Sequence, residues 1–266
     1  MAIEPEPPGT EGSAAPAGRR RGGWRFGVTV LALLVGTAGL AASAAGVSAQ
    51  LLPRRFTAHQ QQQIIAWEWA RRWRTLPAGE IFPASVTYQL PAGTLGAGSP
   101  LPLQAYRVGI SRPANCTVAS DPAAGRVLSA DRCTALLRAT YADETDSMLV
   151  TVGVAVMPGV SAAQAAAGEL ANGRGPQPGI RAAPFPSTLA RAFGDRQRQL
   201  SWAVSSGPYL IMSTAGYADG RPRVQMSSDS YADTEMTSFA TGVADAVRAP
   251  LGAVPPAPQC PGAPGC

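Results

Sequence analysis

Two groups of acidic residues are the first candidates for chemistry in this sequence. Asp143, Glu144 and Asp146 lie together in "ADETD", and a second group lies nearer the C-terminus: Asp229, Asp233 and Glu235. Neighbouring carboxylates can exchange protons in acid–base catalysis or bind calcium, although the DxDxDG spacing of a calcium loop is absent. Hairpin turns also favour aspartate, and a helix N-terminus favours acids through its dipole. We therefore expect both groups to have structural roles.

The segment "GYADGRPRV" at 216–224 is a second candidate. It contains Asp219-Gly220, a turn signal, with Arg221 and Arg223 beside it. Two arginines in a turn can form an anion-binding loop. The same residues are also typical of a solvated turn, which we expect here.

The residues that are missing exclude several functions. All 22 basic residues are arginine, and His59 is the single histidine. Without lysine there is no P-loop lysine and no Schiff-base lysine, and one histidine cannot build a His-rich zinc site. Any Ser-His-Asp arrangement would need His59. The sequence therefore predicts a protein that is not an enzyme, with no catalytic, cofactor or metal site.

The basic charge does not predict a nucleic-acid partner. The net charge is +5, and the arginines after Arg55 are scattered in runs of one or two. A nucleic-acid surface needs a concentrated basic stripe with stacking aromatic side chains. The charge is typical of an ordinary solvated surface.

Residues 24–52 are predicted to form a transmembrane helix. The run 26–52 has no charged residue, and as a helix it would be about 40 Å long, enough to cross a membrane core of roughly 30 Å. Interfacial side chains flank the run on both sides: Arg19, Arg20, Arg21, Trp24 and Arg25 before it, and Arg54 and Arg55 after it. Arginines on the short N-terminal flank place it in the cytoplasm and the rest of the chain outside the cell membrane.

A cleaved signal peptide is the alternative. The small-residue sites "ASA" at 42–44 and "VSA" at 47–49 would suit signal peptidase, and the mature protein would then be secreted. Cleavage and anchoring both export residues 56–266, so the extracytoplasmic location does not depend on the choice.

Four cysteines agree with export to an oxidising compartment: Cys116, Cys133, Cys260 and Cys266. Four cysteines allow three disulfide pairings. The simplest joins Cys116 to Cys133 and Cys260 to Cys266, and the second pair could instead bond another chain.

The chain divides into five predicted parts. Residues 1–23 form a disordered cytoplasmic segment, because their composition cannot bury apolar surface. The transmembrane helix at 24–52 and a juxtamembrane helix at 53–76 follow. Residues 77–249 form the extracytoplasmic domain, and residues 250–266 form a tail rich in proline and glycine.

The juxtamembrane helix begins with a Thr57 cap and ends before Pro77. Its apolar positions share one helical face: Ile65, Trp69, Trp73 and Leu76. We expect this face to pack on the domain's own sheet. Contact with anionic headgroups and pairing with a partner helix are the alternatives.

Strand signals dominate the domain. The alternating or β-rich runs are 85–90, 103–111, 134–141, 147–157 and a hairpin at 199–218 that turns at Gly207-Pro208. Helices are predicted at 161–173 and 231–252, the second with an apolar face at Met236, Phe239, Val243 and Val247. Strands linked as hairpins, with helices covering one face, predict an α+β fold with an antiparallel sheet.

Three segments resemble the uncharacterised single-pass envelope proteins of actinobacteria: "RRWRTLPAGEIFP", "TALLRATYADETD" and "GYADGRPRV". The resemblance covers most of 70–225 and implies a membrane location but no activity. The functional hypothesis is a membrane-tethered, non-catalytic extracytoplasmic domain that contacts the bilayer and an envelope protein. Small residues four apart in the apolar stretch would also allow a homodimer. The alternative function is a sensor that binds a small ligand on an uncovered face of its sheet.

Overall fold

The computed structural model describes residues 27–37, 55–171, 175–225 and 230–258. Residues 27–37 are helical and belong to a unit separate from the compact unit Phe56–Gln259. Within the described residues, no helix is both long enough and apolar enough to cross a membrane. The rest of the predicted span and all of its flanking residues except Arg55 lie outside the described residues, as do 1–23 and the C-terminal end of the tail.

Six antiparallel strands form one sheet in the order β1-β2-β3-β4-β6-β5. Their bounds are β1 Ser85–Leu90, β2 Leu101–Ile110, β3 Ala135–Asp143, β4 Met148–Val156, β5 Arg198–Ser206 and β6 Tyr209–Tyr217. Every neighbouring pair is antiparallel. The predicted α+β class with an antiparallel sheet is confirmed.

Five helices accompany the sheet in the compact unit's described residues: α2 Ala58–Thr75, α3 Ala78–Ile81, α4 Pro122–Ala130, α5 Val160–Leu170 and α6 Tyr231–Gly252. Short 3₁₀ turns lie at η1 Thr94–Gly96, η2 Leu189–Ala192 and η3 Asp195–Gln197. Helix α4 was not predicted, although its start carries a clear signal. Asp121 accepts hydrogen bonds from the N–H groups of Ala123 and Ala124, and Pro122 occupies the first helical position.

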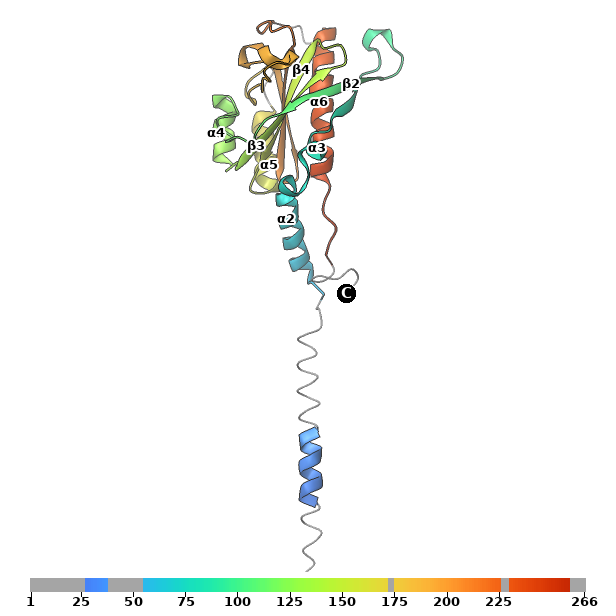
Figure 1. The fold of residues 1–266 in the computed structure, drawn as a ribbon, viewed down its shortest axis with the longest axis vertical. Coiled ribbons are helices and arrows are strands. Elements are labelled where there is room, and N and C mark those ends of the chain that lie inside the picture. The colour runs from blue at the N-terminus through green and yellow to red at the C-terminus, as the bar shows by residue number, and fades with distance from the viewer. Residues whose placement is uncertain (1–26, 38–54, 172–174, 226–229, 259–266) are drawn as a thin grey trace, which may run out of the picture. The chain divides into compact units, whose positions relative to one another are not determined.

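The prediction that helices cover one face of the sheet is wrong, because helices pack on both faces. Helix α6 packs on one face, where Phe239 and Val243 belong to the same core cluster as Val152. Helices α4 and α5 cover the other face through Leu128 and Ala166 (Figure 1). The reason lies in β4, whose nine residues are all buried. A central strand that is apolar on both sides must be covered on both sides.

The apolar face predicted for α6 packs in the larger core. Met236, Phe239, Val243 and Val247 are all fully buried. Gly242 lies against Tyr88, where a Cβ atom would come within 2.4 Å of the tyrosine Cβ. The missing side chain therefore lets α6 approach β1 closely.

Helix α2 is fixed to one end of the domain through its C-terminal half. Trp69, Trp73 and Leu76 pack partly buried against the larger core. The Tyr209 hydroxyl donates to the Trp69 carbonyl over 2.6 Å and accepts from the Trp73 N–H over 3.2 Å. The Trp69 ring also lies on the β5–β6 turn at Gly207, where φ is +56° and a Cβ would come within 2.2 Å of the ring. The expected contact of this helix with its own domain is thus present.

The predicted boundary between domain and tail at residue 249 falls inside helix α6. Helix α6 continues through Pro250 to Gly252. The following residues run back along α2, where Arg72 donates to the Ala253 carbonyl over 2.7 Å and Pro255 is buried. These contacts extend the domain into the predicted tail.

A disulfide joins Cys116 to Cys133 with an S–S distance of 2.01 Å. It links the loop before α4 to the loop that enters β3. This half of the simplest predicted pairing is confirmed, while Cys260 and Cys266 lie outside the described residues.

Candidate functional site

Asp143 ends β3 and closes the β3–β4 turn. Its side chain is 1% exposed. The carboxylate accepts hydrogen bonds from the N–H of Met148 over 2.6 Å, the N–H of Thr145 over 3.2 Å and the hydroxyl of Ser147 over 3.2 Å. The oxygens of the buried Asp143 carboxylate are thus engaged by donors from the turn itself. This is the geometry of a residue that closes a turn.

The other predicted acids lie in different surroundings. Glu144 accepts from the Gln104 N–H over 3.0 Å and so joins the turn to β2. Asp233 lies in the first turn of α6, where its N–H donates to Ser230 Oγ. Burial raises the pKa of Glu235, the charge of Asp143 raises it further, and a hydrogen bond with Tyr231 opposes both effects. Asp229 lies outside the described residues.

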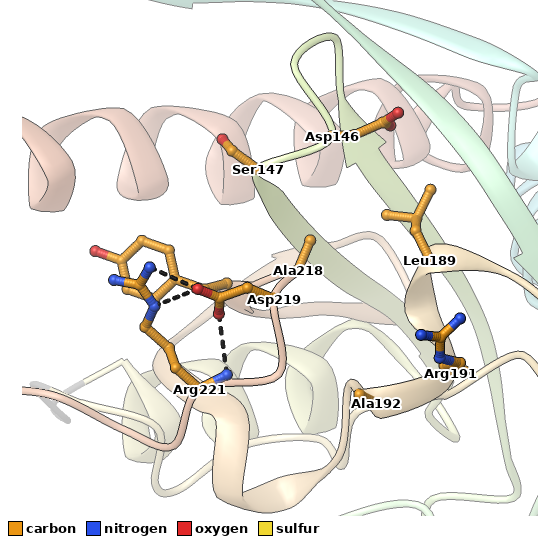
Figure 2. Close-up of a pocket in the computed structure, with 9 residues that line it drawn as sticks. Asp146, Ser147, Leu189, Arg191, Ala192, Ala218, Asp219 and Arg221 are labelled. Atoms are coloured by element: carbon orange, nitrogen blue, oxygen red, sulfur yellow. Dashed lines mark hydrogen bonds and ion pairs between the residues drawn. The ribbon is translucent and has the colours of Figure 1, made fainter.

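A surface cavity of about 580 Å³ joins two of the segments that the sequence singled out (Figure 2). The β3–β4 turn meets the segment after β6, because the Ala218 N–H donates to the Ser147 carbonyl over 2.9 Å. The 3₁₀ turn η2 supplies the third wall. The lining residues are Asp146, Ser147, Leu189, Arg191, Ala192, Tyr217, Ala218, Asp219 and Arg221.

Arg221 and Asp219 form a local ion pair on the cavity wall. Asp219 accepts from the N–H of Arg221 over 3.0 Å and from its Nε over 2.6 Å, and the guanidinium lies 4.6 Å above the Tyr217 ring. The hydrogen bonds from Arg221 hold the pKa of Asp219 below its ordinary value. Figure 2 shows Arg191 on the other side of the cavity. Asp219 thus compensates the charge of Arg221, so this guanidinium is already paired at the cavity wall.

Asp146, Arg191 and the Arg221–Asp219 pair place charges of both signs beside Leu189 and Tyr217 on the cavity wall. Within the described residues, no group of three His, Cys, Asp or Glu side chains could hold a metal ion. His59 is exposed in the first turn of α2.

The α2 contact and the cavity lie at opposite ends of strand β6. This strand runs from Tyr209, which contacts α2, to Tyr217, which lines the cavity, and its extended length is roughly 27 Å.

Comparisons with known proteins add no function. No family model, curated protein or solved structure matches this chain. The resemblance to actinobacterial envelope proteins therefore remains a prediction.

One buried ion pair was not predicted from the sequence. Asp121 Oδ2 lies 3.2 Å from Arg198 Nη2, and both side chains are almost fully buried. The same oxygen accepts from the Gly179 N–H over 2.8 Å, while Arg198 Nε donates to Thr214 Oγ1 over 3.0 Å. The Asp121-Pro122 dipeptide signalled the helix cap, but no local pattern pointed to its charged partner. Through these hydrogen bonds the pair connects α4, the segment that contains Gly179, and strands β5 and β6 of the sheet.

Replacing Asp143 with alanine is expected to lower the free energy of unfolding by about 2 kcal/mol, because the buried N–H of Met148 and the N–H of Thr145 lose their acceptor. Urea unfolding of the full chain in detergent measures the change. Asp146→Asn is the matched control, since Asp146 is exposed at φ +56°, a conformation that asparagine tolerates. Equal stabilities of the two variants would contradict the structural role of Asp143.

Proposed function

We propose that this chain is a membrane-tethered, non-catalytic extracytoplasmic domain that acts through contacts with another envelope protein. The arrangement of the two ends of the domain carries the proposal. Helix α2 follows the predicted membrane segment and packs beside the β5–β6 turn, whereas the 580 Å³ cavity lies at the other end of β6. The tether would thus join the domain through α2, at the end of β6 opposite the cavity, and a partner would contact the cavity end.

The disulfide supports the extracytoplasmic location. Cys116 and Cys133 are bonded in the structure, and such bonds persist mainly in oxidising compartments. This support holds for an anchored protein and for a protein released by signal peptidase. The choice between anchor and secretion therefore depends on the N-terminus of the mature chain.

A sensor that binds a small ligand is the alternative function. Packing by α6 on one face and by α4 and α5 on the other counts against a ligand held on an uncovered sheet face. A different version of this function places the ligand in the cavity beside the β3–β4 turn. One observation favours it: the cavity volume of about 580 Å³ lies within the usual range for small-molecule sites.

Photocrosslinking in intact cells tests the tether and the contact together. A photoreactive residue replaces Arg191 on the cavity wall, and the matched control carries it at the exposed Ser129 in α4. We expect the full chain in the membrane fraction, with its original N-terminus, and a discrete protein adduct from position 191 only. A mature chain that begins at Ala45 or Gln50 would contradict the tether. Equal adducts from both positions, or none from either, would contradict a contact through the cavity end.

A further inference from the structure

A second cavity, of about 320 Å³, lies at the beginning of β5 and is rich in arginine. Arg196, Arg198 and Arg223 line it together with Asp195, and Pro176 and Gln177 complete the wall. The three arginines come from η3, the first residue of β5 and the segment after β6. Neither cluster of acids that the sequence raised for chemistry takes part in this cavity.

Arg198 is held in place by its surroundings. Its side chain is 1% exposed and is hydrogen-bonded to Thr214 Oγ1, Asp121 Oδ2 and the Pro176 carbonyl. Gly179 leaves room for it, because a Cβ there would come within 2.7 Å of the Arg198 Nη2 atom. A guanidinium fixed in this way loses little conformational freedom when an anion binds.

Arg196 and Arg223 lie on neighbouring segments and are less compensated. The Arg223 N–H donates to the Arg196 carbonyl over 2.8 Å, and the Val224 N–H donates to Gln199 Oε1 over 3.0 Å. The Arg223 guanidinium lies against Gly175, where a Cβ would come within 3.0 Å of it. Across the described ranges, neither Arg196 nor Arg223 forms an ion pair with an acidic side chain.

The charge around the cavity is positive. Asp195 pairs with Arg181 and lies 4.0 Å from Arg198 Nη1, and Asp121, which does not line the cavity, pairs with Arg198. Among the described residues, the cavity and its ion-pair partners thus hold two aspartates and four arginines: Arg181, Arg196, Arg198 and Arg223. Burial lowers the pKa of Arg198, and the hydrogen bond and charge of Asp121 oppose this effect.

We propose that this cavity binds the phosphate group of an anionic ligand. Guanidinium groups form charge-assisted, often bidentate hydrogen bonds with phosphate. A tetrahedral phosphate can offer separate oxygens to three arginines, whereas a carboxylate offers two oxygens in one plane. The cavity exceeds the size of a bare phosphate ion and therefore leaves space for an attached group. This inference goes beyond the proposed function and does not depend on the tether or on the protein contact.

Calorimetric titration of the full chain in detergent tests the site, with inorganic phosphate as the probe and acetate as the carboxylate comparison. We expect saturable phosphate binding that Arg223→Gln weakens by about tenfold or more, since each charge-assisted hydrogen bond contributes about 1.5–3 kcal/mol. Arg221→Gln is the matched control. It lies two residues away on the same segment, but Asp219 compensates its charge beside the other cavity.

The outcomes separate the site from general electrostatic attraction. An unchanged thermal unfolding midpoint shows that Arg223→Gln remains folded. Absence of saturable phosphate binding, equal binding of acetate, or equal loss in Arg221→Gln and Arg223→Gln would overturn the proposal. Glycerol phosphate distinguishes the source of the ligand: tighter binding than inorganic phosphate supports a phosphate ester, and equal binding supports the free ion.

Discussion

Replacing Asp121 with alanine is expected to lower the free energy of unfolding by about 3–5 kcal/mol, because it leaves the buried charge of Arg198 without its carboxylate partner. The substitution also removes the cap from α4, where Asp121 accepts from the N–H groups of Ala123 and Ala124. It further leaves the Gly179 N–H without its acceptor. Urea unfolding of the full chain in detergent measures the loss.

Two comparisons make this result specific to the buried pair. Asp245→Ala removes an exposed pair with Arg248 and should change stability by about 0.5 kcal/mol or less. Combining Asp121→Asn with Arg198→Met removes both buried charges and should cost less than the sum of the two single substitutions. The buried pair would have no special role if Asp121→Ala cost no more than Asp245→Ala.

Removing the disulfide is expected to lower the free energy of unfolding by about 3 kcal/mol, because Cys116 and Cys133 close a loop of intermediate length in the unfolded chain. The loop contains the whole of α4, whose Leu128 packs in the core on the face of the sheet that α5 covers. Replacing both cysteines with serine, and measuring urea unfolding of the full chain, tests the expectation.

The background for this measurement carries serine at Cys260 and Cys266, so that a reductant acts on one bond. Reductant should destabilise the protein with Cys116 and Cys133 intact to the level of the double-serine variant. It should leave the double-serine variant itself unchanged. Equal stability before and after reduction would show that the bond does not support the fold.

The Asp121–Arg198 pair links these stability effects to the proposed phosphate site. Asp121 caps the start of α4 and pairs with Arg198, which lines the arginine-rich cavity. Loss of this carboxylate would release Arg198 and also leave a less compensated charge at the cavity. A ligand stabilises the state that binds it. Added phosphate should accordingly stabilise the original protein against urea more than it stabilises the Arg223→Gln variant.

Local sequence patterns predicted the elements whose packing is local or strongly periodic. Strand β1 alternates between exposed and buried residues over 85–90, as its sequence indicates. Helix α6 occupies the predicted range 231–252, and its predicted apolar positions are buried. The continuous apolar run of β4 also indicates burial on both faces, in conflict with the prediction that helices cover only one face.

The sequence by itself determined the antiparallel α+β class, the turn at Gly207-Pro208 and the local disulfide as the simplest pairing of Cys116 and Cys133. These features follow from hydrophobic period, turn chemistry and short separation along the chain. They need no knowledge of distant contacts.

Only the tertiary structure decided where Arg198 lies. The register shifts between Arg198 and Leu200, so these residues, two apart in β5, lie on opposite faces. Simple alternation would have placed Arg198 beneath α6, because one extra residue in a strand exchanges the two faces beyond it. Long-range contacts likewise separate Arg221 from Arg223, one beside Asp219 and the other in the arginine-rich cavity. Their environments depend on segments distant along the chain, and so no local pattern could specify them.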